Sequence, residues 1–228
     1  MSGFVGQRCP SVPSQACPLR GADADGAAVC ADLHRIQIVP RGDYLFSQGE
    51  DCLAIHAVLS GAIVLEYVDG AGGVAIMRLV RRGEMVGSAD LFDGHEHRTS
   101  ARVVEDALIC TLPEASLMTA MNADGAFAVR LLRASAEETH AFGDFAQRMA
   151  SLPVEARVLA LIEDLSAGRP RFVLPISKKD LAFMAGTGPE VLSRTLMKLQ
   201  KAGVIWMEGN TVTMQDPALD GRAARIAC

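Results

Sequence analysis

The stretch SKKDLAFMAGTGPEVLSRTLMKLQKAGVI, residues 177–205, decides the fold of the C-terminal part of the chain. Ser177 is followed three residues later by Asp180, the spacing of a capping box, so a helix is predicted to begin here. The GTG at 186–188 then predicts a tight turn, and Pro189 suits the first position of a second helix. Two helices joined by a short glycine turn are typical of a helix-turn-helix unit.

The residues on either side of this unit complete a domain. Gly203 suits the end of the second helix, and VIWMEGNTVTM (204–214) predicts two short strands around the GN pair at 209–210. Upstream, Pro153 opens a further helical segment, EARVLALIEDLS. We therefore predict that residues 153–228 form a winged helix-turn-helix domain that binds double-stranded DNA.

The second helix carries polar side chains near its start that can read base edges. The N-terminal turns of such a helix enter the major groove, and Glu190 and Arg194 lie on one face because they are four residues apart. Arginine can donate two hydrogen bonds to guanine and glutamate can accept one from cytosine, while Ser193 can contact a thymine methyl group or a base edge. The lysines that can meet phosphates are Lys178, Lys179, Lys198 and Lys201.

The charge of the chain is unevenly distributed. Residues 176–203 hold five basic and two acidic side chains, a net charge of +3, which leaves −8 for the rest of a chain whose total is −5. The acidic total is therefore no argument against DNA binding. The alternative for these residues is a solvated helix pair with an ion pair between Glu190 and Arg194.

Residues 36–112 predict an all-β domain. Apolar runs of strand length alternate with turn signals about every ten residues, which favours a β-sandwich or β-roll, here assigned to residues 36–120. The runs are IHAVL, AIVLEY, VAIMRLV and ALICTL, and the turn signals are Gly42, Gly49, Ser60-Gly61, Asp69-Gly70, Gly72-Gly73, Gly83, Gly87 and Asp93-Gly94.

Between these domains, residues 121–152 predict a long helix. Phe142, Phe145, Met149 and Leu152 are spaced 3, 4 and 3 residues apart, as in a coiled-coil seam. Continuing that spacing toward the N-terminus makes the seam partly polar. The spacing favours a homodimer, and the alternative is a helix that packs on its own β-domain. The predicted dimer interface consists of Leu131, Glu138, Phe142, Phe145 and Met149.

Composition excludes several other classes of protein. Half of the 228 residues are hydrophobic, too many for a disordered chain, yet no apolar run approaches the roughly 18 residues that span a membrane. The N-terminus lacks an apolar signal core, so we expect a cytoplasmic protein with no membrane partner. No nucleophile elbow, phosphate loop or catalytic carboxylate pair is evident, so we expect a non-enzyme.

Several quoted stretches resemble the CRP/FNR family of bacterial transcription regulators over residues 36–220. RGDYLFSQGE, followed by LSGAI, resembles the first β-roll signature of the family, and RRGEMVGSADLF resembles the second. PEVLSR resembles the recognition helix, and MKLQKAGVI the residues after it. The resemblance implies an α+β protein with an N-terminal double-stranded β-roll of the cyclic-nucleotide-binding type, a long dimerisation helix and a C-terminal winged helix-turn-helix. It also implies RNA polymerase as a partner.

Within the family, the FNR branch is more similar than the cyclic-AMP branch. Gly87 is followed by Ser88, where the cyclic-AMP branch has a glutamate for the ribose, although Arg98-Thr99 could still suit a phosphate. The pattern E-x-x-S-R at 190–194 resembles the FNR branch, and the resemblance implies a TTGAT-like half-site. His95 and His97 resemble a cupin metal pair, but the glutamate that a cupin needs is missing.

The resemblance to FNR-type oxygen sensors also implies a 4Fe–4S cluster, held by three cysteines of an N-terminal arm and one of the β-roll. Oxidative loss of the cluster would release the arm, residues 1–35, and favour monomers, so the protein would sense oxygen or nitric oxide. The alternative is a regulator without a cluster, which senses haem-bound gas, a nucleotide or another small ligand in the β-roll. The implied ligands are Cys9, Cys17, Cys30 and Cys110, with Cys52 in reserve and Cys228 incidental. The arm departs from the family in its spacing, C-x7-C-x12-C.

Overall fold

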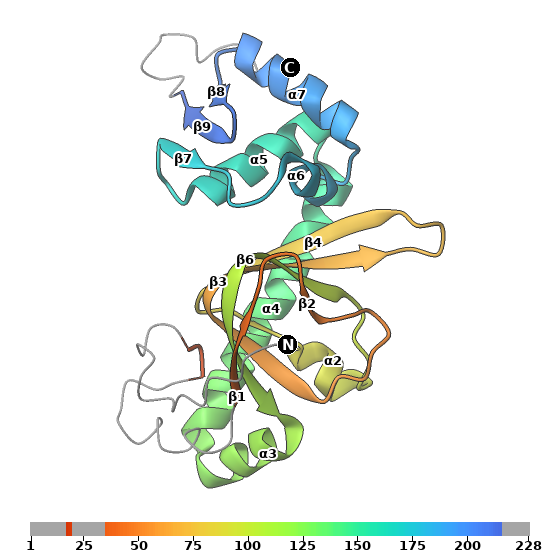
Figure 1. Ribbon diagram of the computed structural model, residues 1–228, viewed down its shortest axis with the longest axis vertical. Helices are drawn as coiled ribbons and strands as arrows, with labels where there is room; N and C mark the ends of the chain where they lie inside the picture. The colour runs from red at the N-terminus through yellow and green to blue at the C-terminus, as the bar shows by residue number, and fades with distance from the viewer. Residues whose placement is uncertain (1–16, 20–34, 216–228) are drawn as a thin grey trace. The chain divides into compact units, whose positions relative to one another are not determined.

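The computed structural model describes residues 17–19 and 35–215 (Figure 1). The chain divides into two compact units, Met1–Phe145 and Ala146–Cys228. Each unit has its own core, and one long helix, α4 (Gly125–Ser151), begins in the first unit and ends in the second. Over the described residues, no helix is both long and apolar enough to cross a membrane.

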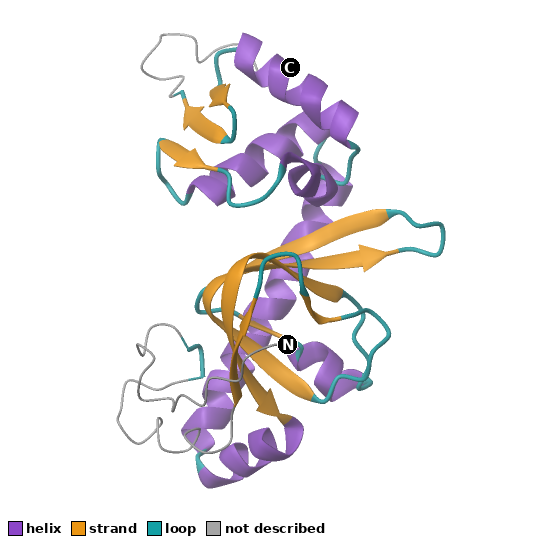
Figure 2. Ribbon diagram, viewed as in Figure 1, coloured by secondary structure: helices purple, strands orange, loops and turns teal. Residues whose placement is uncertain are grey.

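The N-terminal unit is built on a six-stranded antiparallel sheet, drawn as orange arrows in Figure 2. The strand order is β1-β6-β3-β4, while β2 pairs with β6 and β5 pairs with β3. The predicted N-terminal β-domain is therefore confirmed. The strands are β1 (Arg35–Val39), β2 (Tyr44–Phe46), β3 (Ala54–Val68), β4 (Val74–Arg81), β5 (Met85–Val86) and β6 (Ser100–Pro113).

One predicted turn of this domain is wrong. Ser60-Gly61 does not separate two strands but lies inside β3, where the pairing with β6 shifts register. Gly61 has φ of +78°, and a Cβ atom built on it would lie 2.3 Å from the carbonyl oxygen of Asp106. Only glycine fits so close an approach, so this residue marks a bulge that bends a long strand.

Among the described residues, two large clusters of buried apolar side chains and one small one support the sheet. The core inside the roll contains apolar side chains from the β-strands, and a second core joins the roll to α3 (Glu114–Ala123) and α4. The roll core consists of Val39, Phe46, Val58, Ile63, Leu65, Val80, Val86, Ala101, Val103, Ala107 and Ile109. In the second core, α4 contributes Phe127, Leu131 and Ala134, so the first half of this helix is fixed to its own roll.

Asp124 separates α3 from α4 and is the reason that the helical stretch is not continuous. Its backbone is extended, with φ of −141° and ψ of 104°, and its carboxylate accepts a hydrogen bond of 2.8 Å from the backbone N–H of Ala126. This is the arrangement of a helix N-cap. Residues 121–123, predicted as part of the long helix, instead close α3.

Up to residue 215, the C-terminal unit contains the end of α4, three further helices and a small sheet. The predicted helix-turn-helix and the predicted strand pair after it are both confirmed. A third strand, β7, pairs with β9 and is too short, at three residues, to be visible as a sequence pattern. The elements are α5 (Val154–Ser166), β7 (Arg171–Val173), α6 (Lys178–Met184), α7 (Pro189–Lys201), β8 (Ile205–Glu208) and β9 (Thr211–Met214).

Candidate functional site

Local hydrogen bonds fix the turn between α6 and α7. Ser177 Oγ accepts a 3.0 Å hydrogen bond from the backbone N–H of Asp180, which confirms the predicted cap of α6. At the other end, the N–H groups of Gly186 and Thr187 donate to the carbonyls of Phe183 and Ala182, at 3.1 and 3.0 Å. These two bonds form a Schellman motif, which needs the left-handed backbone that Gly186 adopts, with φ of +60°.

The turn presents α7 with one face buried and the other exposed. Leu192, Leu196 and Leu199 pack into the unit, whereas Glu190 and Arg194 are 88% and 75% exposed. The carboxylate of Glu190 lies 3.8 Å from the guanidinium of Arg194, so the two form a loose ion pair on the open face. Because both are exposed, water screens this pair and DNA can compete for either group.

Three of the four lysines predicted to meet phosphates fall into two groups, and the fourth, Lys201, is exposed at the end of α7. Lys178 and Lys179 line a notch of about 260 Å³ together with Ser193 of α7 and Gly209 of the wing. The structure therefore brings two lysines, a predicted base-reading serine and the wing to one place. Lys198 does not line this notch, and its ammonium group instead makes an ion pair with Glu155 of α5.

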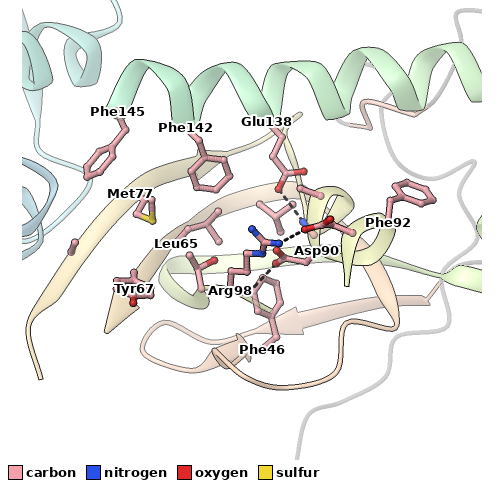
Figure 3. Close-up of a pocket in the computed structure, with 16 residues that line it drawn as sticks. Phe46, Leu65, Tyr67, Met77, Asp90, Phe92, Arg98, Glu138, Phe142 and Phe145 are labelled. Atoms are coloured by element: carbon pink, nitrogen blue, oxygen red, sulfur yellow. Dashed lines mark hydrogen bonds and ion pairs between the residues drawn. The ribbon is translucent and has the colours of Figure 1, made fainter. Parts of the chain in front are cut away.

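The N-terminal unit holds a much larger cavity, of about 820 Å³, between the roll, α2 (Ser88–Asp93) and α4 (Figure 3). The resemblance implied a ligand pocket in the β-roll, and Arg98 and Thr99, which it assigned to that pocket, line the cavity. Most of its lining is apolar. The aromatic residues of the lining are Phe46, Tyr67, Phe92, Phe142 and Phe145.

Glu138 of α4 reaches into the wall of this cavity and is only 3% exposed. Its carboxylate accepts hydrogen bonds from the N–H of Gly87, at 3.0 Å, from the N–H of Ser88, at 3.3 Å, and from the Ser88 hydroxyl. Burial raises the pKa of this carboxyl group, and the hydrogen bonds partly offset the rise. Glu138 thus ties α4 to the start of α2 within one chain.

Arg98 and His97, which follow α2 in the chain, contact the carboxylates of that helix. Arg98, at the mouth of the cavity, makes an ion pair with Asp93, and its backbone N–H points to the carboxylate of Asp90 at 3.4 Å. The ring of His97 stacks on Phe46, with 3.6 Å between centroids, and its Nδ1 lies 3.4 Å from the same Asp90 carboxylate.

Two of the four predicted cluster ligands lie in the described residues. Cys17 and Cys110 are half-buried, and both pack against the small core formed by Ile36 and Leu59. The other two, Cys9 and Cys30, lie outside the described residues. Over the residues that the structure describes, no three His, Cys, Asp or Glu side chains form a metal-binding group.

The reserve ligand, Cys52, is fully buried in the core between the roll and the helices. Its sulfur lies 3.5 Å from the carbonyl oxygen of Gly87 and 3.6 Å from that of Ala54, so the S–H group has acceptors. Burial raises the pKa of this thiol to about 11. Cys52 is therefore a protonated core thiol in this structure.

Two family comparisons account for both units. Residues 36–124 match the cyclic nucleotide-binding domain, and residues 156–219 match the Crp-like helix-turn-helix domain. The chain belongs to the CRP/FNR family of transcription regulators. The family membership confirms the resemblance drawn from the sequence. Regulators of this family bind DNA, act as dimers and are not enzymes.

Individual CRP/FNR proteins are similar over most of the chain. The fumarate and nitrate reduction regulatory protein of Salmonella typhimurium is 25% identical over 206 residues, which cover 86% of this chain and 82% of that protein. The anaerobic regulatory protein of Haemophilus influenzae is 25% identical over 191 residues, 81% of this chain and 74% of its own length. The structure of FixK2 from Bradyrhizobium japonicum superposes with a TM-score of 0.72 at 20% identity. The match covers 85% of this chain and 99% of the FixK2 chain.

The five residues predicted for the dimer interface differ in how far their own chain covers them, since Leu131 and Glu138 are buried and Phe142, Phe145 and Met149 are half-buried. Leu131 and Glu138 are buried against the roll, and Phe142 and Phe145 line the cavity. Met149, in the C-terminal unit, has its sulfur 3.2 Å from the guanidinium of Arg157. The same helix has a different face that is open and carries small or apolar residues at heptad spacing, all exposed. We call this face the open stripe: Val129, Leu132, Ala136, Thr139 and Gly143.

Proposed function

We propose that this chain is an FNR-type regulator whose binding to a TTGAT-like palindrome depends on an iron–sulfur cluster held by Cys9, Cys17, Cys30 and Cys110. Oxygen or nitric oxide is the signal, and loss of the cluster weakens the dimer. At a promoter in the cytoplasm, the bound dimer contacts RNA polymerase.

The observation that carries the cluster proposal is the position of Cys17 and Cys110. They are 93 positions apart in the sequence, yet both lie against Ile36 and Leu59, half-buried rather than fully enclosed. Four thiolates are the usual ligands of a 4Fe–4S cluster, and these two cysteines bring one thiol of the N-terminal arm and one of the β-roll to the same small core. When bound, the cluster supplies sensitivity to oxidants, because oxidation destroys it.

The dimer in this proposal uses the open stripe of α4. Val129, Leu132, Ala136, Thr139 and Gly143 follow one another at steps of 3 and 4, the repeat of a two-stranded coiled coil. Leu132 is 66% exposed and Val129 is 49% exposed. Burying these two apolar side chains against a second helix would therefore stabilise the dimer. The small residues allow the two helices to approach closely.

The test is the visible absorption of protein purified without oxygen, followed by exposure to air. We expect a broad brown absorption that bleaches in air, together with loss of the TTGAT footprint. Cys110→Ser should abolish both the colour and the footprint, while Cys228→Ser, the matched control at the C-terminus, should keep both. A colourless anaerobic protein that binds the palindrome fully, in air or without it, would overturn the proposal.

A further inference from the structure

The exposed face of α7 carries a methionine in line with the predicted base-reading residues. Glu190, Ser193, Arg194 and Met197 occupy positions i, i+3, i+4 and i+7 of this helix, and all four are exposed. Seven residues turn an α-helix by about 700°, so Met197 lies within about 20° of Glu190 around the helix axis. A helix in the major groove reads bases with side chains at this spacing. Met197 is therefore the next side chain of the face that carries the predicted readers.

Packing within the domain does not account for the position of Met197. The three leucines of α7 are buried in the unit, whereas Met197 is 50% exposed. An apolar side chain with this exposure is stabilised when another surface covers it. Val191 is the other large apolar side chain exposed on α7, at 41%, but it lies about 100° around the helix from Glu190. Of these two apolar side chains, Met197 is the one on the reading face.

The neighbours of Met197 belong to the elements that meet the DNA backbone. Met197 lines the notch of about 260 Å³ together with Lys178 and Lys179 of α6, Ser193 of α7 and Gly209 of the wing. A duplex whose phosphates meet these two lysines has its major groove over α7. Such a duplex covers Met197 as well as Ser193.

We propose that Met197 is a further specificity-determining residue, which contacts the C5-methyl group of a thymine in each half-site. That methyl is the apolar group that bases present in the major groove, and the flexible thioether side chain of methionine adapts well to such a contact. Glu190 and Arg194 read polar base edges, so a methyl contact adds a different kind of information. The proposal rests on DNA binding through α7, and neither on the cluster nor on the TTGAT sequence.

The spacing along α7 also indicates where this thymine lies. Met197 is three residues beyond Arg194, which corresponds to about 4.5 Å along the helix axis, and successive base pairs are about 3.4 Å apart. We therefore expect the thymine one or two base pairs from the guanine whose recognition needs Arg194.

The experiment uses the full-length protein, purified without oxygen, and the palindrome that it selects from random DNA. Each thymine is replaced in turn by deoxyuridine, symmetrically in both half-sites, which removes one methyl group per half-site and keeps the base pairing. Fluorescence anisotropy measures the binding. For the wild type, we expect one replacement to weaken binding about fourfold per half-site, or about fifteenfold for the palindrome, as expected for one buried methyl group.

Variants of α7 assign that methyl effect to a side chain. Met197→Ala should bind the thymine and deoxyuridine palindromes within about twofold of each other, whereas Met197→Leu, which keeps a large apolar side chain, should retain most of the difference. Val191→Ala is the matched control and should retain all of it. A methionine that only fills the notch would change binding to both palindromes alike.

The outcomes separate this proposal from the function proposed above. A selected palindrome unlike TTGAT, or a colourless protein, counts against that function and leaves the methyl contact to be decided by the deoxyuridine series. The contact is overturned if no thymine replacement weakens the wild type, if Met197→Ala keeps the full difference, or if Val191→Ala loses it.

Discussion

At the residue scale, two buried titratable side chains of the N-terminal unit stand out. His56 lies in β3 with its Nδ1 3.0 Å from the Thr111 hydroxyl, and burial, with a smaller effect of His97, lowers its pKa from 6.5 to about 3. Glu138 is buried with its pKa raised. Each of these shifts opposes the charged form, and neither could be predicted from the sequence, because both depend on contacts between distant segments.

The lowered pKa of His56 makes the stability of the protein dependent on pH. The unfolded histidine takes up a proton below pH 6.5, while the folded one stays neutral down to about pH 3, so stability is full above pH 6.5 and falls as the pH falls through this window. Between about pH 7 and pH 5, we expect the wild type to lose about 2 kcal/mol more unfolding free energy than His56→Gln.

Urea unfolding followed by circular dichroism at each pH measures this difference. The control is His140→Gln on the exposed side of α4, which should follow the wild type at both pH values. Equal pH dependence of His56→Gln and the wild type would show that folding does not lower the pKa of His56.

At the element scale, the sequence predicted where helices begin, turn and end, but not what packs against their faces. The caps and the glycine turn of α6 and α7 were identified correctly, because a Schellman motif depends on a few adjacent residues. The spacing of Phe142, Phe145 and Met149, at steps of 3 and 4, correctly indicated an apolar side of a helix, although the next residue of the series, Leu152, lies just beyond the end of α4. It could not say whether a second chain, the chain's own roll or a cavity lies against that side, since periodicity carries no information about the occupant.

Leu132 of the open stripe tests which side of α4 dimerises. Leu132→Glu places one carboxylate from each chain in the proposed seam, where burial without a partner is costly, so we expect dimer dissociation to increase roughly hundredfold. Glu137→Lys is the control, because it changes the charge of an exposed position outside the stripe. The measurement is anaerobic sedimentation velocity. A fully dimeric Leu132→Glu protein would place the interface elsewhere.

At the scale of the whole molecule, the chain combines an acidic total with one basic region. The net charge of +3 over residues 176–203 belongs to α6, α7 and the residues that flank them, in a chain whose total is −5. This division was visible in the sequence, since it needs only counting along the chain. The resemblance also implied a ligand pocket in the β-roll and a common site for Cys17 and Cys110. The aromatic lining of the cavity and the contact of the two cysteines with Ile36 and Leu59 were not predicted, because they depend on residues that are far apart in the chain.

The roles of Lys178, Lys179 and Arg194 can be separated by the salt dependence of DNA binding. Each phosphate contact contributes about −0.9 to the slope of log K against log salt, so replacing both lysines by Gln in a dimer should reduce that slope by about 3 to 4. This change should weaken binding to all DNA sequences alike.

Arg194→Ala should instead reduce the binding free energy by about 1–3 kcal/mol on the TTGAT palindrome and by much less on unrelated DNA. Fluorescence anisotropy at several salt concentrations measures both effects, and a uniform loss with Arg194→Ala would assign this arginine to the phosphate backbone.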